Sequence, residues 1–241
     1  KILFIRNKRI IIAPRGELYP GALKIKRNKK LFFLRFVKII NLFSNVVWHA
    51  TSEDEKKVIR NIFPKSTILI SLNFYENLNT KIKLPKSNHI DDKIRIIYYS
   101  RITPKKNLRY CIEILSQVSV KFKMDIYGPI DDDIYWEDCK KLINKFDLLN
   151  KIEYCGTIKR SKIVQTLTNY DLFMLPTFGE NFGHVIFDAI NCGLPVLLSN
   201  NTPWKNIHNY SIGWSIPLQE KNNYIKIING FESWTKINKK E

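Results

Sequence analysis

The chain has 241 residues, of which 44% are hydrophobic and 12% aromatic, and it carries a formal net charge of +18. This composition excludes an intrinsically disordered chain, and the length suffices for one large or two ordinary domains. No apolar run reaches the roughly 20 residues that a membrane-spanning helix needs. The four cysteines are widely spaced without a C-x-x-C pair, which is typical of reduced core residues in a cytosolic protein.

The first part of the chain predicts a small α/β unit. Three short apolar runs read as strands: 9–13, 46–49 and 68–72. Between them, residues 21–43 read as a helix, and a second helix runs from Ser52 to the residue before Pro64. Ser52 is the expected N-cap, with Glu55 completing a capping box. The polar, Asn-rich residues 73–93 have the composition of an interdomain linker.

From residue 94 onward, strands and helices alternate regularly. The predicted strands are 94–100, 123–127, 151–155, 171–175, 195–199 and 213–216. The predicted helices are 107–120, 133–146, 160–168, 183–192, 203–209 and 221–232. This alternation predicts a doubly wound parallel sheet, in which ligands bind beyond the carboxyl ends of the strands. We therefore divide the chain into residues 1–85 and 86–241.

Two cations follow the first of these later strands. Arg101 and Lys106 lie five positions apart in a loop that opens the next helix. Cations near a helix N-terminus at a strand's carboxyl end favour an anion such as a diphosphate. Taken alone, the same residues also fit a solvated basic loop.

A second loop follows strand 171–175. Gly179 and Gly183 allow a sharp turn and a close approach of a ligand to the backbone. Glu180 lies in this loop, and Asp188 follows eight positions later, within the next helix. Two carboxylates so placed are suited to two separate polyol parts of one ligand, such as a hexose and a ribose. Glu180 by itself also fits an ordinary surface acid.

Together these motifs resemble the family 4 (group 1) retaining glycosyltransferases, whose hallmark is an E-x₇-E motif. This chain has Glu180 followed by Asp188 where the family usually has a second Glu, and Asn181 where many members have Gly. Residues 100–107, with Ser-Arg and Pro-Lys-Lys-Asn, match the family's phosphate loop. Two further strand-end segments match as well: Ile-Tyr-Gly-Pro at 126–129 and Tyr-Cys-Gly-Thr-Ile at 154–158.

The resemblance implies a GT-B fold, with two Rossmann-like domains, and a metal-independent transfer of a hexose from a UDP- or GDP-sugar without a further cofactor. By position, Arg101 and Lys106 would neutralise the leaving diphosphate, where a departing oxocarbenium-like transition state most needs stabilisation. Glu180 would bind the hexose hydroxyls and Asp188 the ribose. The implied donor-binding residues are Gly128, Gly156, Thr157, Ile158, Asn181, Phe182, Gly183, His184 and Asp188.

The segment around Arg15 and Gly16 resembles the family's acceptor-side P-H-G segment. The permanent cation of Arg15 replaces an imidazole and suits an anionic acceptor such as a phospholipid-linked sugar. Family members usually have a longer acceptor domain before this point and a closing helix after residue 241. The resemblance therefore implies that residues 1–85 are a remnant of the N-terminal domain and its linker.

Residues 1–40 hold twelve Lys or Arg against one acid, Glu17, and so supply +11 of the net charge. For the basic segment 23–43, a solvated helix face and peripheral contact with an anionic membrane are equally favoured. Membrane contact through this segment would place the protein at the inner face of the plasma membrane. Nucleic acid is least favoured, because no nucleic-acid motif accompanies the charge. The four histidines share no metal-ligand spacing.

Three functions from different classes follow. The leading hypothesis is a glycosyltransferase that builds a surface polysaccharide or a lipid-linked glycan. The alternatives are a nucleotide-sugar-binding module without catalysis and a GT-B nucleotide-sugar epimerase. The epimerase is disfavoured, since the sequence shows no additional acid/base residues for that reaction.

Overall fold

The computed structural model describes residues 10–24, 27–71 and 93–238. The chain forms two compact units, the first comprising Lys1–Tyr75 with Gly179–Phe182 and the second Glu76–Phe178 with Gly183–Glu241. The predicted boundary at residue 85 lies outside the described residues, as does nearly all of the predicted linker. Within the described residues, no helix combines the length and the apolar character needed to cross a membrane.

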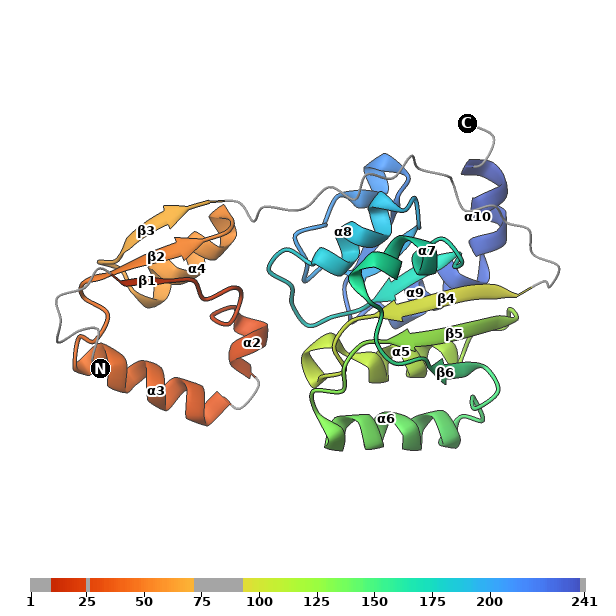
Figure 1. Cartoon of the computed structure of the whole chain (residues 1–241), viewed down its shortest axis with the longest axis horizontal. Helices are drawn as coiled ribbons and strands as arrows, with labels where there is room; N and C mark the ends of the chain where they lie inside the picture. The colour runs from red at the N-terminus through yellow and green to blue at the C-terminus, as the bar shows by residue number, and fades with distance from the viewer. Residues whose placement is uncertain (1–9, 25–26, 72–92, 239–241) are drawn as a thin grey trace. The chain divides into compact units, whose positions relative to one another are not determined.

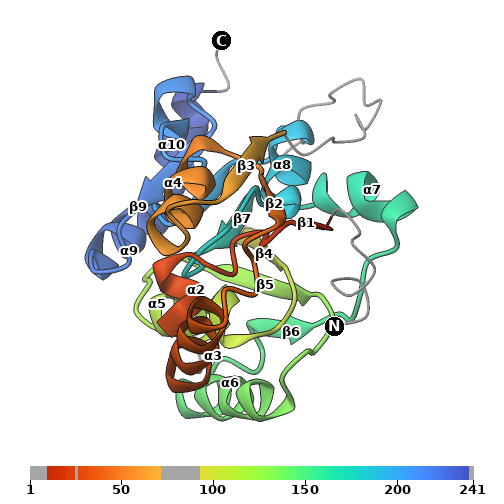
Figure 2. The same cartoon turned by 90° about the vertical axis from the view of Figure 1, so that its left-hand side faces the viewer.

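The first unit contains a three-stranded parallel sheet with the order β1-β2-β3. Its strands are β1 (Ile10–Ile12), β2 (Val46–Ala50) and β3 (Thr67–Ile70), and its helices are α2 (Pro20–Lys24), α3 (Arg27–Ile39) and α4 (Glu53–Ile62). Figure 2 shows α2 beside α3 and α4 beside β3. Its small core centres on Trp48, which packs against Phe43 and Phe63.

The predicted single helix 21–43 is wrong, because the chain forms two helices here and α3 ends at Ile39. Asn41 adopts a left-handed conformation with φ 48°, and the N–H of Leu42 donates to the carbonyl of Val37 over 3.1 Å. This is the hydrogen-bond pattern of a helix C-terminus closed by a left-handed residue, a conformation that asparagine tolerates well.

The second unit contains a six-stranded parallel sheet with the order β6-β5-β4-β7-β8-β9. Its strands are β4 (Ile94–Tyr99), β5 (Phe122–Tyr127), β6 (Ile152–Tyr154), β7 (Leu172–Leu175), β8 (Val196–Ser199) and β9 (Gly213–Ile216). Its α-helices are α5 (Leu108–Leu115), α6 (Asp133–Lys145), α7 (Ile163–Leu167), α8 (His184–Asn191), α9 (Lys221–Asn229) and α10 (Phe231–Asn238). Three 3₁₀ turns complete it: η1 (Pro104–Lys106), η2 (Arg160–Lys162) and η3 (Ile207–Tyr210).

The predicted doubly wound sheet is confirmed. Every neighbouring strand pair is parallel, and Figure 1 shows α5 and α6 on one side of β4 and β5 and α7 and α8 on the other. The chain winds outward from β4 to β6, crosses back to β7 and winds the other way to β9. The reversal falls between β4 and β7, which pair at only two positions, whereas β4 and β5 pair at six.

The central strands of this sheet are buried because their sequences are almost wholly apolar. β7 and β8 are buried at every residue, as strands covered by helices on both faces must be. The predicted helix 221–232 is interrupted at Gly230, which ends α9 before α10 begins. Glycine loses more conformational entropy on folding than any other residue, which favours a break there.

Candidate donor-binding site

Two loops meet at the point where the strand order reverses. The backbone N–H of Phe178 and the hydroxyl of Thr177 each donate to the carbonyl of Lys105 over 2.9 Å. The side-chain amide of Asn107 donates to the carbonyl of Pro176, also over 2.9 Å. The loop after β4 and the loop after β7 are therefore fastened together at the carboxyl edge of the sheet. Parallel α/β sheets bind their ligands at this switch point.

The two predicted phosphate-binding cations differ in their surroundings. Arg101 is well exposed, and its Nη1 lies 3.1 Å from Oδ2 of Asp131. Such an exposed ion pair contributes at most about 1 kcal/mol, so an incoming phosphate can displace Asp131 at little cost. Lys106 ends the 3₁₀ turn η1 and is only 8% exposed. Lysines this buried are rare unless their charge is compensated. Burial therefore restricts the side chain of Lys106 more than that of Arg101.

The start of α8 carries the next predicted residues. Gly183 is the N-cap in a left-handed conformation, φ 80°, and offers no side chain to cap the helix. His184 is the first residue of α8, and Asp188 lies one helical turn further on. A helix start of this kind directs backbone N–H groups and a partial positive charge at an anion.

Glu180, Asn181 and Phe182 group with the first unit rather than with the cations. Within that unit, the Asn181 Oδ1 lies 2.7 Å from the hydroxyl of Thr51. Chain connectivity keeps the Cα of Glu180 within about 8 Å of the Cα of Phe178, at 3.8 Å per residue. The predicted contact of Glu180 with the same ligand as Arg101 and Lys106 stays a prediction.

Asp188 is almost completely buried, and an arginine holds its carboxylate. The Nη1 of Arg160 lies 3.1 Å from Oδ1 and 3.0 Å from Oδ2 of Asp188. Tyr99, the last residue of β4, lies beside this pair, and burial, followed by the negative charge of Asp188, raises its pKa. Sequence reasoning missed Arg160. The available signal was a cation shortly after the predicted strand 151–155.

The predicted glycines lie at neighbouring strand ends. The N–H of Gly128 donates to the carbonyl of Gly156 over 2.8 Å. Gly128 has φ 143°, and a Cβ added to it would lie 1.9 Å from the carbonyl oxygen of Ser100. The ends of β4, β5 and β6 are therefore closely joined. Of the predicted base-lining residues beyond Gly156, Thr157 is exposed and Ile158 packs partly buried against the core.

In the first unit, the predicted acceptor-side residues Arg15 and Gly16 form a turn, and a buried carboxylate binds the backbone of Gly16. Both have positive φ, 48° and 83°. Oε1 of Glu55 accepts from the N–H of Gly16 over 2.7 Å, while Oε2 accepts from the N–H and the hydroxyl of Thr51. Only half of the predicted capping box forms, since Ser52 accepts from the N–H of Glu55 but the Glu55 carboxylate is engaged elsewhere.

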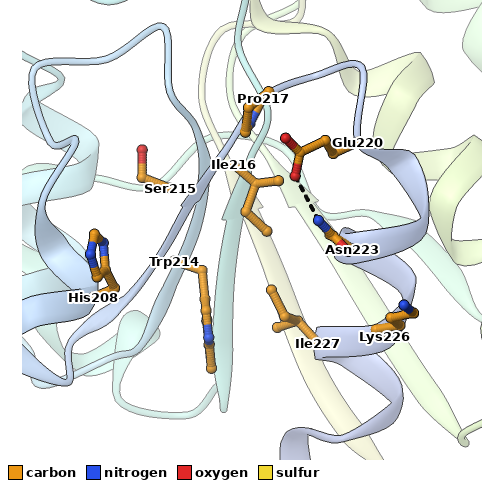
Figure 3. A pocket seen from close by; sticks show the side chains of 9 residues that line it. All are labelled: His208, Trp214, Ser215, Ile216, Pro217, Glu220, Asn223, Lys226 and Ile227. Atoms are coloured by element: carbon orange, nitrogen blue, oxygen red, sulfur yellow. Dashed lines mark hydrogen bonds between the residues drawn. The ribbon is translucent and has the colours of Figure 1, made fainter.

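A pocket of about 380 Å³ lies in the second unit between β9 and α9. Figure 3 shows Trp214 and Ile216 on the strand side and Glu220, Asn223 and Ile227 on the helix side. Glu220 accepts a 2.6 Å hydrogen bond from Asn223. None of the predicted site residues lines this pocket, so we place the candidate site at the switch point instead.

A doubly wound parallel sheet with two loops joined at its switch point defines a Rossmann-like ligand-binding domain. A family model described as "Glycosyl transferases group 1" matches residues 79–238, and the chain belongs to this family. An uncharacterized glycosyltransferase of Methanocaldococcus jannaschii is 26% identical over 152 residues, which cover 62% of this chain and 37% of that protein. The O-antigen biosynthesis glycosyltransferase WbnH of Escherichia coli is 23% identical over 171 residues, which cover 71% of this chain and 46% of that protein.

Solved structures show the fold. The crystal structure of Anabaena HepE in complex with UDP and glucose has a TM-score of 0.71 at 18% identity, covering 95% of this chain and 65% of that one. A complex of S. aureus TarM that contains UDP has a TM-score of 0.63 at 20% identity, and the match covers 76% of this chain and 36% of that one. The chain thus has the predicted α/β fold of GT-B glycosyltransferases. It spans less than half the length of the two curated relatives described above.

Proposed function

We propose that this chain binds a nucleotide-diphosphate sugar and takes part in the transfer of its hexose, with retention, to a glycan or lipid-linked acceptor of a surface polysaccharide. The observation that carries this proposal is the pair of hydrogen-bonded loops at the switch point, Lys105–Asn107 with Pro176–Phe178. Family membership supports a transferase. The similarity to a structure that contains UDP supports a nucleotide-sugar donor. The similarity to an O-antigen biosynthesis glycosyltransferase supports a role in surface polysaccharide synthesis.

In this proposal Arg101 leaves Asp131 and joins Lys106 at the diphosphate. The start of α8, from Gly183 to His184, adds backbone N–H donors to the same phosphates. Glu180 binds the hexose, and the nucleoside lies along Gly156–Ile158 toward Asp188. Positive charge at the leaving diphosphate accelerates the reaction because negative charge accumulates there in the transition state.

Metal independence is part of the proposal, since Arg101 and Lys106 supply the positive charge that a divalent cation would otherwise provide. Among the described residues, no three His, Cys, Asp or Glu side chains are grouped so that they could hold a metal ion. The corresponding test is donor binding and transfer in EDTA. A loss of donor binding that Mg²⁺ or Mn²⁺ restores would contradict this part of the proposal.

The test of donor binding is calorimetry with UDP, GDP and their hexose derivatives on wild type and on Arg101→Ala and Glu180→Ala. We expect Arg101→Ala to lose most nucleotide affinity, and Glu180→Ala to lose discrimination between sugars while nucleotide binding remains. Arg109→Ala is the matched control, because Arg109 is a half-exposed arginine of α5 paired with Asp138. Unchanged binding by Arg101→Ala would contradict the proposed site, and donor binding without transfer to any acceptor would favour the non-catalytic module.

We further propose that α3 contacts an anionic membrane from the cytoplasmic side. Phe32, Phe36 and Ile39 are 74%, 51% and 83% exposed and recur at helical spacing on one face. Phe33 and Ile40 extend this exposed apolar face. The same helix carries four exposed cations: Arg27, Lys29, Arg35 and Lys38. Exposed aromatic residues beside basic ones are typical of helices that lie in the interface of anionic membranes.

A further inference from the structure

The ion pair of Arg160 and Asp188 brings a third loop to the switch point. Arg160 opens η2, after the edge strand β6, whereas Asp188 belongs to α8, which follows β7. Tyr99 at the end of β4 lies near both, since both charges act on its hydroxyl. The ion pair therefore joins the turn after β6 to the helix after β7, beside the end of β4.

The two partners are very unequally accessible. The side chain of Asp188 is 2% exposed, whereas that of Arg160 is 47% exposed. One nitrogen of Arg160 spans both carboxylate oxygens of Asp188. A ligand hydroxyl approaching from solvent therefore meets the guanidinium first, and it can reach the carboxylate only if Arg160 moves away. Breaking a buried ion pair is costly, because it leaves a buried charge without compensation.

The position along α8 indicates which part of a ligand lies there. Asp188 is four residues beyond His184, a rise of about 6 Å at 1.5 Å per residue. A ligand that has its diphosphate at the start of α8 and runs along this helix places its next polar group about one helical turn further on, beside the ion pair. In a nucleoside diphosphate, that group is the ribose with its two hydroxyls.

We propose that Arg160 is a specificity-determining residue that donates to the ribose hydroxyls of the donor nucleotide, and that Asp188 is a positioning residue that holds Arg160. This inference rests on the proposed function, because it requires a nucleoside diphosphate at the switch point. It changes the role that the sequence assigned to Asp188: the carboxylate acts on the ribose through the guanidinium. Lysine would keep the charge at position 160 but lose the planar set of donors.

The experiment measures the affinity of the full chain for UDP, 2′,3′-dideoxy-UDP and inorganic pyrophosphate by calorimetry, with GDP and its dideoxy form in parallel. The variants are Arg160→Lys and the double variant Arg160→Ala with Asp188→Asn, which avoids an unpaired buried carboxylate. Arg109→Lys is the control, since Arg109 is ion-paired and 45% exposed. Thermal unfolding of each variant checks that it is folded.

Wild type is expected to prefer the ribonucleotide over its dideoxy form by about tenfold, the effect of one or two hydrogen bonds from a charged donor. Both Arg160 variants should lose this preference while their affinity for pyrophosphate stays within about twofold of wild type. A retained preference in the folded variants would overturn the inference, as would tighter UDP binding by Arg160→Lys, which would make Asp188 the direct ligand. Wild type that binds neither nucleotide nor pyrophosphate would instead refute the proposed function, and this inference with it.

Discussion

The side-chain amide of Asn107 donates a 2.9 Å hydrogen bond to the carbonyl of Pro176, a residue 69 positions further along the chain. Asn107 is buried, has a left-handed backbone with φ 59°, and lies between η1 and α5. One residue thus both reverses the chain direction after Lys106 and fastens the loop after β4 to the loop after β7.

Replacing Asn107 separates these two roles. Asn107→Gly keeps the left-handed backbone but loses the side-chain bond, for an expected loss of about 1 kcal/mol in the free energy of unfolding. Asn107→Ala should lose about 1 kcal/mol more, because alanine is strained in this conformation. Urea denaturation measures both values. Nucleotide affinity should fall in the same order, since both substitutions loosen the two loops.

Asp147 supplies the control for Asn107, because it is exposed and left-handed with φ 54°. Asp147→Gly and Asp147→Ala report the backbone contribution at a position far from the predicted site. If Asn107→Gly proves no more destabilising than Asp147→Gly, the hydrogen bond to Pro176 does not hold the loops together.

Gly128 and Gly156 form a second matched pair, since both have positive φ, but only Gly128 is crowded. A Cβ at Gly156 meets no atom within 4 Å, whereas a Cβ at Gly128 would lie 1.9 Å from the carbonyl oxygen of Ser100. We expect Gly156→Ala to cost about 1–2 kcal/mol for its backbone alone. Gly128→Ala should cost more than about 4 kcal/mol or prevent folding. Equal losses in urea denaturation would show that the close approach of Gly128 to Ser100 is absent in solution.

Glu55 is the expected determinant of the turn at Arg15 and Gly16. Glu55→Gln replaces an acceptor oxygen by an NH₂ group that faces a backbone N–H, so the free energy of unfolding should fall by about 2 kcal/mol. The exposed Glu53, which pairs with Lys56 across one helical turn, is the control, and Glu53→Gln should change stability by less than about 0.5 kcal/mol. A result for Glu55→Gln as small as that of Glu53→Gln would refute the role of this carboxylate.

Membrane contact through α3 predicts sedimentation of the protein with phosphatidylglycerol vesicles but not with phosphatidylcholine vesicles. The triple substitution of Phe32, Phe36 and Ile39 by serine should weaken binding at least about tenfold, because each buried apolar side chain contributes about 1.5–3 kcal/mol. Lys29→Glu with Arg35→Glu should weaken it through the lost attraction to anionic lipid. Ile134→Ser, which changes an exposed residue of α6, is the control. Equal binding by all variants would contradict the membrane proposal.

The elements of the second unit followed from local patterns in the sequence. The apolar run Leu172–Leu175 is bounded by Asp171 and Pro176, and short apolar runs that alternate with helices predict buried parallel strands. The loops at the switch point were predictable for the same reason, because the carboxyl ends of neighbouring parallel strands must lie at one edge. The observed pairing of β4 with β7 brings those two loops together.

Side-chain pairs between distant segments could not be predicted in this way. The partner of Asp188 lies 28 positions before it, and that of Gly16 lies 39 positions after it. Periodicity carries no information on which of several charged residues completes such a pair. Glu55 fitted a local capping pattern, yet its carboxylate is satisfied by Gly16 and Thr51, so tertiary structure overrode the local signal.

The short ladder between β4 and β7 has a consequence for how the second unit comes apart. Only two register pairs join the half built on β4–β6 to the half built on β7–β9 within the sheet itself. A nucleotide that lies across this β4–β7 seam would contact both halves of the sheet and so join them where they share the fewest register pairs. Amide hydrogens of β4 and β7, on both sides of the seam, should then exchange more slowly when the ligand binds.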